Sequence, residues 1–213
     1  MRSRVQGLAR DAIERGEPLA WFEQLYAAAQ DENDIPWADR RPNPGLLEWI
    51  EEHGVPQGRA LVVGSGLGDD AEALAARGLD VTAFDIAPTA IAWSRRRFPA
   101  SPVDYRDANL FDLPVEWEGA FDFVFEAFTL QALPPELRPA AASAIAGALA
   151  PGGTALVIAR GRDEDEPLGE LPWPLTRAEL LRLFAGLEQV QLEDYLDAEP
   201  VRRLRLTVRR PSV

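Results

Sequence analysis

Short runs rich in apolar residues recur along the middle of the chain and predict buried β-strands. They lie at residues 60–63, 81–84, 103–106, 121–125 and 154–159. Continuous apolar runs are typical of parallel strands that are covered on both faces. Segments with apolar residues at helical spacing separate them, most clearly at residues 88–98 and 135–150. Strand and helix in alternation predict a doubly wound α/β sheet.

The N-terminal part of the chain has no strand pattern. Residues 1–17 are polar and predict either a short helix or a disordered arm, whereas residues 18–29 predict an amphipathic helix. A loop rich in Pro, Asp, Asn and Arg follows over residues 31–45, and residues 46–52 predict a short helix that ends at Gly54.

Near the C-terminus the hydrophobic period changes to two. Leu204, Leu206 and Val208 alternate with polar residues, and Arg203 and Arg205 lie on the opposite face. This pattern predicts strands at the edge of the sheet with one face in water. We therefore expect an antiparallel pair to close an otherwise parallel sheet.

Charge and rare residue types narrow the classes of function. The 22 basic and 35 acidic residues give a net charge of −13, which argues against binding to nucleic acid or to an anionic membrane. The absence of Cys, together with a single His (His53), excludes disulfides, thiol nucleophiles and most metal clusters. No stretch approaches the roughly 20 apolar residues of a membrane span, and no signal peptide is evident. We expect a cytoplasmic protein without a metal.

The predicted strands end at residues that suit ligand binding. The first runs into a glycine-rich segment, residues 64–68, and the next three end at Asp85, Asp107 and Glu126. Ligands of open α/β folds bind beyond the carboxyl ends of the strands. Glycines there let the backbone approach a ligand closely, and the N-terminus of the next helix offers free N–H groups. The sequence therefore predicts a ligand site at this edge.

The helix after the glycine segment opens with two acids. Asp69 is expected to cap it, with Glu72 as the partner in a capping box. Two carboxylates at a helix N-terminus would repel a pyrophosphate. Asp69 and Asp70 therefore favour a ligand that carries positive charge.

Each acid at a strand end has a functional interpretation and an ordinary one. Asp85 can accept both hydroxyls of a ribose, or cap the next helix. Asp107 can accept an adenine amino hydrogen beside Ala108 and Asn109, or only stabilise a turn. Glu126 follows so apolar a strand that it is expected to face a cleft, although an ion pair would also explain it.

These segments, in their order and spacing, resemble the successive motifs of class I S-adenosylmethionine-dependent methyltransferases. The resemblance covers about residues 46–160 and rests on residues 61–68, 84–86, 107–114 and 149–154. It implies a Rossmann-like, seven-stranded sheet with an antiparallel C-terminal strand pair. It also implies S-adenosylmethionine as the cofactor. The residues that the resemblance assigns to it are Gly64, Ser65, Gly66, Asp85, Ile86, Asp107, Ala108, Asn109 and Glu126.

A narrower similarity is to the thiopurine S-methyltransferase-like group, which includes plant halide/thiol methyltransferases. This similarity rests on residues 35–37, 42–44, 111–114, 171–173 and 178–180. In that group an N-terminal Trp covers the cofactor near its sulfonium, a role that passes to Trp37, and an aromatic face beside a cation is favourable. Trp21, Tyr26 and Trp173 become candidate contacts of the methyl acceptor. Ala127 stands where the thiopurine enzymes carry an Arg, which disfavours thiopurine itself.

The resemblance implies in-line transfer of a methyl group to a small-molecule nucleophile, such as a thiol or a halide. No general base is evident, and Glu126 and Asp39 are the candidates if one is needed. We expect one domain over residues 1–213, as a monomer or homodimer. Its parts would be a lid extension (1–45), a cofactor-binding core (46–160) and an acceptor-side segment (161–213). A nucleotide-dependent oxidoreductase and a non-catalytic cofactor-binding protein of the same fold remain alternatives.

Overall fold

The sheet has seven strands, in the order β3-β2-β1-β4-β5-β7-β6. This computed structural model describes residues 2–212. The strands are β1 (Arg59–Val63), β2 (Asp80–Asp85), β3 (Asp104–Asp107), β4 (Phe121–Ala127), β5 (Leu149–Arg160), β6 (Glu188–Leu196) and β7 (Arg202–Arg209). Strands β1 to β5 pair in parallel, and β7 pairs antiparallel to β5 and to β6. The predicted Rossmann-like sheet with an antiparallel C-terminal pair is therefore confirmed.

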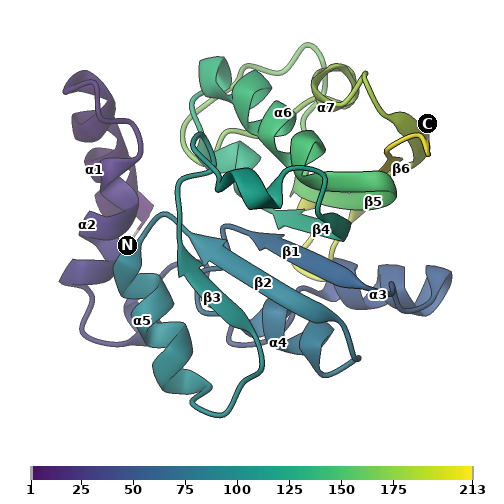
Figure 1. Ribbon diagram of the computed structural model, residues 1–213. Coiled ribbons are helices and arrows are strands. Elements are labelled where there is room, and N and C mark those ends of the chain that lie inside the picture. The colour runs from purple at the N-terminus through teal and green to yellow at the C-terminus, as the bar shows by residue number, and fades with distance from the viewer. Residues whose placement is uncertain (1, 213) are drawn as a thin grey trace.

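Helices cover both faces of the sheet, as Figure 1 shows. They are α1 (Arg2–Glu14), α2 (Ala20–Ala28), α3 (Pro44–His53), α4 (Asp69–Ala75), α5 (Pro88–Arg97), α6 (Arg138–Ala148) and α7 (Arg177–Leu183). One apolar core joins α6 and α7 to the sheet, and a second joins α3, α4 and α5 to the other face. This burial on both faces is the reason why the central strands contain so few polar residues. No helix within residues 2–212 is both long and apolar enough to cross a membrane.

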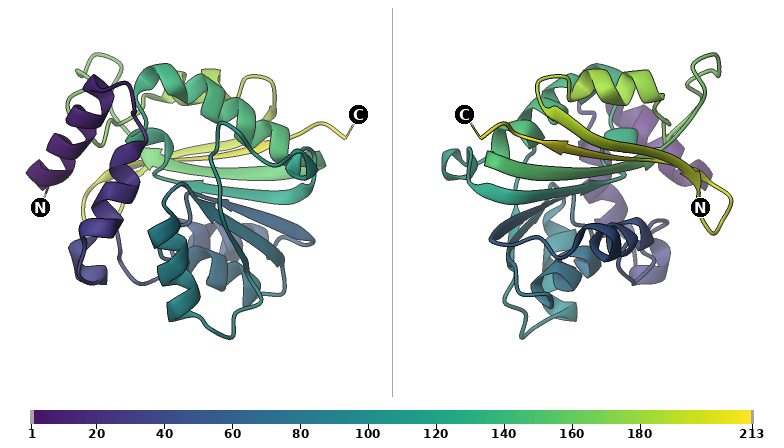
Figure 2. Two further views of the ribbon diagram at one scale, coloured as in Figure 1. Left: turned by 60° about the vertical axis from the view of Figure 1, so that its left-hand side comes forward. Right: turned by 90° about the vertical axis from the view of Figure 1, so that its right-hand side faces the viewer.

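The N-terminal helices pack at the carboxyl edge of the sheet, at the opposite end from the C-terminus (Figure 2). Residues 1–17 had two possible interpretations, and the described part forms helix α1. Its Val5, Ala9 and Ala12 are buried in a third core, together with Trp21 of α2 and Trp93 of α5. This small core holds α1 and α2 over the ends of the strands.

The start of α4 differs from the prediction. Gly68, with φ +90°, is the N-cap, and it has no side chain to cap the helix. Asp69 lies in the first turn and pairs instead with Arg97 at 2.7 and 2.9 Å. Glu72 accepts a hydrogen bond from the Tyr105 hydroxyl at 2.7 Å. The predicted capping box is wrong because the chain leaves the glycine segment in a left-handed conformation, and Tyr105 occupies the space that a Cβ at Gly68 would need.

Candidate active site

A cavity of ≈ 800 Å³ opens at the carboxyl edge of the sheet. The ends of β1, β2, β4 and β5 form its floor, and the segment after β3 forms one side. Helix α2, the loop before α3, the N-terminus of α3, the segment after β4 and the β6–β7 hairpin contribute further walls. Eleven predicted site residues line it: Trp21, Tyr26, Trp37, Asp39, Gly64, Ser65, Gly66, Asp85, Ile86, Ala108 and Asn109. Sequence patterns from three strand ends, helix α2 and the loop after it thus converge on one cavity.

The glycine segment and Asp85 form the centre of the cavity. Gly64 and Gly66 have φ values of +60° and +54°, which favour glycine. The two carboxylate oxygens of Asp85 accept the N–H groups of Gly66 and Ala87, each at 2.9 Å. Burial raises the pKa of Asp85 despite these hydrogen bonds. Each carboxylate oxygen still has a second lone pair with which to accept a hydrogen bond from a ligand.

Three aromatic side chains from the N-terminal segment pack together in the cavity wall, and the Tyr26 hydroxyl lies beside Gly66. The Trp37 indole donates a hydrogen bond to the Tyr26 hydroxyl at 2.9 Å, and its ring meets those of Trp21 and Tyr26 edge-on. Trp21 and Tyr26 are almost fully buried, whereas Trp37 is 38% exposed. Burial, with a smaller effect of the nearby Asp85 charge, raises the pKa of Tyr26, so its hydroxyl stays protonated. Trp37 is therefore the most accessible of the three.

Glu126 does not face the cleft, contrary to the sequence-based expectation. Its side chain is fully buried, and one carboxylate oxygen accepts the N–H groups of Thr129 at 2.5 Å and Leu130 at 3.2 Å. The other oxygen has no partner, and burial raises the pKa of the group to about 7. The turn after β4 bends back over the carboxyl group because Phe128 adopts φ +71°. Glu126 thereby stabilises this turn from inside the protein.

Two further predicted residues lie outside the cavity wall. Asp107 is exposed at the end of β3, while its neighbours Ala108 and Asn109 line the cavity. Trp173 packs against the small N-terminal core, and its neighbours Leu171 and Pro172 reach the cavity. In both segments, residues one or two positions away from the predicted residue line the cavity in its place.

An acidic group lies between the glycine segment and α3. Asp70 lines the cavity and accepts the Asn43 N–H at 2.6 Å. Burial raises its pKa to about 7, and the charges of Asp69 and Asp39 add to the effect. Arg97 neutralises Asp69, whereas Asp39 is exposed at the rim. This corner of the cavity is electrostatically suited to a cation.

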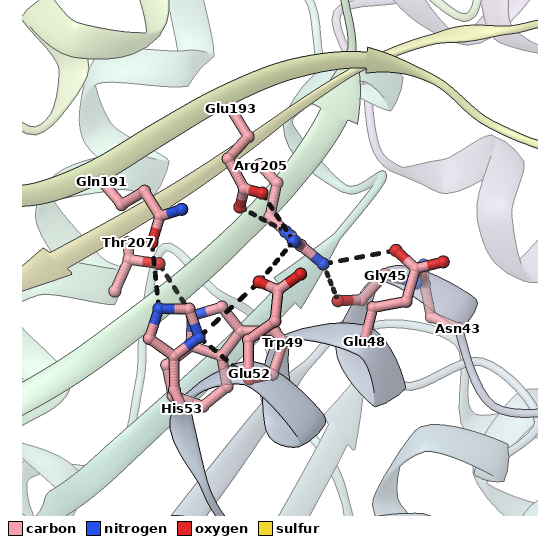
Figure 3. A network of polar contacts seen from close by, with 10 residues as sticks. All are labelled: Asn43, Gly45, Glu48, Trp49, Glu52, His53, Gln191, Glu193, Arg205 and Thr207. Atoms are coloured by element: carbon pink, nitrogen blue, oxygen red, sulfur yellow. Dashed lines mark hydrogen bonds and ion pairs between the residues drawn. The ribbon is translucent and has the colours of Figure 1, made fainter.

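The wall on the side of α3 is fixed by a buried arginine, shown in Figure 3. Arg205 of β7 contacts Glu193 at 2.6 Å, Glu52 at 3.0 Å and the carbonyl of Gly45 at 2.9 Å. Only 2% of Arg205 is exposed, so the prediction of a solvent-facing side of β7 is wrong at this position. Helix α3 covers that face, and its Glu52 satisfies the guanidinium together with Glu193 of β6. The N-terminus of α3, which lines the cavity, is thereby tied to the sheet.

Sequence reasoning missed several wall residues. Phe128, Arg160 and Arg203 all line the cavity on the side of β4, β5 and β7, away from Asp85. Arg203 comes from the β6–β7 hairpin, whose position over the strand ends no local pattern reveals. Asp70 was identifiable from the acidic pair at the start of α4, but its burial was not.

Comparisons with known proteins agree with this geometry. The sequence pattern of the thiopurine S-methyltransferase family matches residues 23–211. A probable thiol methyltransferase 2 of Arabidopsis thaliana is 30% identical over 167 residues, which cover 75% of this chain and 71% of that protein. Thiocyanate methyltransferase 1 of the same plant is 31% identical over 140 residues, or 60% of this chain and 57% of that protein. The chain thus spans little more than half of the second relative.

Solved structures share the fold. A 1,6-didemethyltoxoflavin-N1-methyltransferase of Burkholderia thailandensis has a TM-score of 0.71 at 20% identity, covering 89% of this chain and 87% of that one. The N-methyltransferase NodS of Bradyrhizobium japonicum has a TM-score of 0.70 at 20% identity, with 91% and 98% covered. Both were solved with S-adenosylhomocysteine. The chain therefore belongs to the thiopurine S-methyltransferase family and is an S-adenosylmethionine-dependent methyltransferase of small molecules.

Proposed function

We propose that the methyl acceptor is a small sulfur nucleophile that ionises more readily than an alcohol does. Thiol and thiocyanate methyltransferases are among the sequence relatives. The observation that carries the proposal is the absence of His from the described side chains lining the cavity, in a chain that has no Lys or Cys. The one His, His53, forms hydrogen bonds with Trp49 and Gln191 at the C-terminal end of α3 and does not line the cavity. A thiol, with a pKa near 8.5, needs far less help from a base than an alcohol does.

The residues at the centre of the cavity fit the cofactor. A Cβ at Gly64 would collide with the Thr129 hydroxyl, so only glycine lets the turn after β4 pack this closely against the glycine segment at the floor of the cavity. The Ser65 hydroxyl is buried without a hydrogen-bond partner, and Asp85 keeps free acceptor capacity. Unpaired buried polar atoms of this kind are satisfied when a ligand supplies the missing bonds. When bound there, S-adenosylmethionine supplies a methyl group activated by a sulfonium.

Each part of the cavity receives a role in this proposal. Gly64, Ser65 and Gly66 would contact the methionine part, with Asp70 beside its amino group. Asp85 and Ile86 would bind the ribose, and the segment with Asp107, Ala108 and Asn109 would border the adenine. Trp37, Trp21 and Tyr26 would cover the sulfonium side and exclude water, with Trp173 supporting the same rim. Asp39, at the rim, would take the proton of an acceptor that arrives protonated.

Orientation supplies most of the rate enhancement in this mechanism. The positive charge on a sulfonium disappears as its methyl group is transferred to an anion. A strong charge on the protein near the sulfur would therefore stabilise the transition state little. Alignment of two reactants is worth up to about 7–11 kcal/mol. A wall of packed aromatic rings and a glycine segment fixed by Asp85 are suited to this task, because ring contacts and a hydrogen bond already hold them in place.

We also propose a role for each of three segments of the chain. Residues 1–45 would act as a lid, residues 46–160 as the cofactor-binding core, and residues 161–213 as the acceptor side, within one domain. We further propose a cytoplasmic location, which suits a cysteine-free chain, and a monomeric or homodimeric state. Light scattering of the purified protein with S-adenosylhomocysteine measures the oligomeric state directly.

The purified protein is to be incubated with S-adenosylmethionine and a panel of acceptors: hydrosulfide, thiophenol, thiocyanate, iodide and phenol. Mass spectrometry of S-adenosylhomocysteine and of the methylated product gives the rate for each acceptor. We expect turnover of the sulfur acceptors and none of phenol at pH 7. Turnover of phenol alone would contradict the proposal, and binding of S-adenosylhomocysteine without any turnover would favour the non-catalytic alternative.

A further inference from the structure

Phe128 has an unusual backbone conformation at the wall of the cavity. Its φ of +71° lies in the left-handed region, where a bulky aromatic residue is rare. Such outliers persist only where the surrounding structure enforces them, and they cluster at functional sites. Phe128 lines the cavity and is half-buried.

Contacts from three directions hold Phe128 in this conformation. Its own N–H donates to the Ile158 carbonyl of β5 at 2.9 Å. Glu126 accepts the N–H groups of the next two residues, as described above. The Arg203 guanidinium lies over the Phe128 ring, 4.6 Å from its centroid. Asp197 in turn holds Arg203 at 2.7 Å, so the β6–β7 hairpin is connected to the ring.

The sheet order places this ring away from the adenosyl side. Strands β2 and β3, with Asp85 and the segment after Asp107, lie on one side of β1, whereas β4, β5 and β7 lie on the other. Phe128 follows β4 directly, and Arg203 is on β7. Tyr195 and Leu196 of the same hairpin line this end of the cavity, and Leu196 is 66% exposed. The end that remains for the methyl acceptor therefore has apolar and aromatic side chains (Phe128, Tyr195 and Leu196) beside charged ones (Arg160, Asp197, Glu199 and Arg203).

We propose that Phe128 is a specificity-determining residue for the acceptor and that Arg203 is the residue that positions its ring. The ring would contact the apolar or aromatic body that carries the nucleophilic sulfur, and a bare anion would not reach it. This inference rests on the proposed function, since it assigns a wall to the acceptor of the same reaction. It predicts discrimination between acceptors of different size, with no change in cofactor binding.

The first test is Phe128→Gly, because glycine adopts φ +71° without strain. The variant removes the ring and keeps the backbone. We expect the dissociation constant of S-adenosylhomocysteine to stay within about twofold, and kcat/KM for thiophenol to fall about tenfold or more while that for hydrosulfide changes little. Arg40→Gly is the matched control, since Arg40 also has a left-handed φ of +53° but does not line the cavity. It should leave both rates unchanged.

The second test removes the cation from the ring. Arg203→Met keeps the length of the side chain, and we expect it to raise KM for thiophenol more than it lowers kcat. In the Phe128→Gly background the same change should have no further effect on KM or kcat for thiophenol, because no ring is left to position. Arg59→Met is the control, since Arg59 lies 4.9 Å over Phe121 at the start of β1. It should not alter acceptor preference.

A binding arm separates failure of this inference from failure of the proposed function. Thioanisole, the methylated product of thiophenol, is titrated into the protein saturated with S-adenosylhomocysteine and followed by saturation-transfer NMR. We expect binding to the wild type and its loss in Phe128→Gly, whether or not any thiol is turned over. Equal binding to both proteins, or to neither, would overturn the role of Phe128. A parallel loss of hydrosulfide and thiophenol turnover would do the same.

Discussion

At the scale of single residues, Asp85 combines a structural and a binding role. Its carboxylate organises the glycine segment through Gly66 and also faces the cavity. We expect Asp85→Ala to weaken S-adenosylhomocysteine binding by roughly 10–100-fold, or about 1.4–3 kcal/mol, because charge-assisted hydrogen bonds are lost. Isothermal calorimetry measures the affinity, and urea unfolding of the same variant shows whether the fold survives. Unchanged affinity would contradict the assignment of Asp85 to the cofactor.

Asp70 predicts a pH dependence of cofactor binding. Its pKa is raised to about 7 by burial, with further contributions from Asp69 and Asp39. A bound amino group would favour the charged carboxylate and lower this pKa, so binding releases a proton near pH 7. Affinity should therefore rise with pH through about 7 and level off above it.

Calorimetry in two buffers of different ionisation enthalpy measures the released proton. Asp70→Asn should abolish the release, whereas Asp39→Asn should only reduce the pKa shift. A variant Asp70→Asn that releases as many protons as the wild type would exclude this carboxylate as the source.

At the scale of elements, the fit of α3 against β6 and β7 depends on Arg205. The guanidinium is buried, and its partners Glu48, Glu52 and Glu193 are partly exposed. Removal of the cation leaves these carboxylates uncompensated, at a cost of about 1–3 kcal/mol once their exposure to water is considered. We expect Arg205→Met to lower the free energy of unfolding in urea by this amount.

Arg202 on the same strand offers the matched control. It pairs with Asp194 and Asp163 at a more exposed position. Arg202→Met should therefore change the free energy of unfolding by less than about 1 kcal/mol. Equal losses for the two variants would indicate that burial does not set the contribution of Arg205.

The sequence predicted the sheet well because burial on both faces leaves a local signature in the central parallel strands β1, β2, β4 and β5. The glycine segment and Asp85 were predictable for a similar reason, since both lie at the end of such a strand. The direction of the Glu126 side chain was not predictable, because it depends on the left-handed turn at Phe128. The burial of Arg205 was hidden as well, because the helix that covers it, α3, and two of its carboxylate partners, Glu48 and Glu52, lie more than a hundred residues earlier.

At the scale of the whole molecule, buried carboxyl groups shape the pH dependence of stability. Burial raises the pKa of Glu126 from 4.5 to about 7 and that of Asp70 from 3.8 to about 7. A group whose pKa is higher in the folded state stabilises the fold fully below its unfolded pKa. That contribution is lost as the pH rises through the folded value. These two groups should therefore make the protein less stable at pH 8 than at pH 5.

Glu126→Gln tests this linkage, since the amide oxygen can still accept the N–H groups of Thr129 and Leu130 but the side chain no longer titrates. For a pKa that moves from 4.5 to about 7, the wild type should lose on the order of 2–3 kcal/mol through Glu126 between pH 5 and 8. Urea unfolding at pH 5, 6, 7 and 8 should give a shallower pH dependence for Glu126→Gln. The double variant with Asp70→Asn should be shallower still. If Glu126→Gln keeps the wild-type slope while its overall stability shifts, Glu126 is already ionised in the folded protein, and its free oxygen must have acquired a partner.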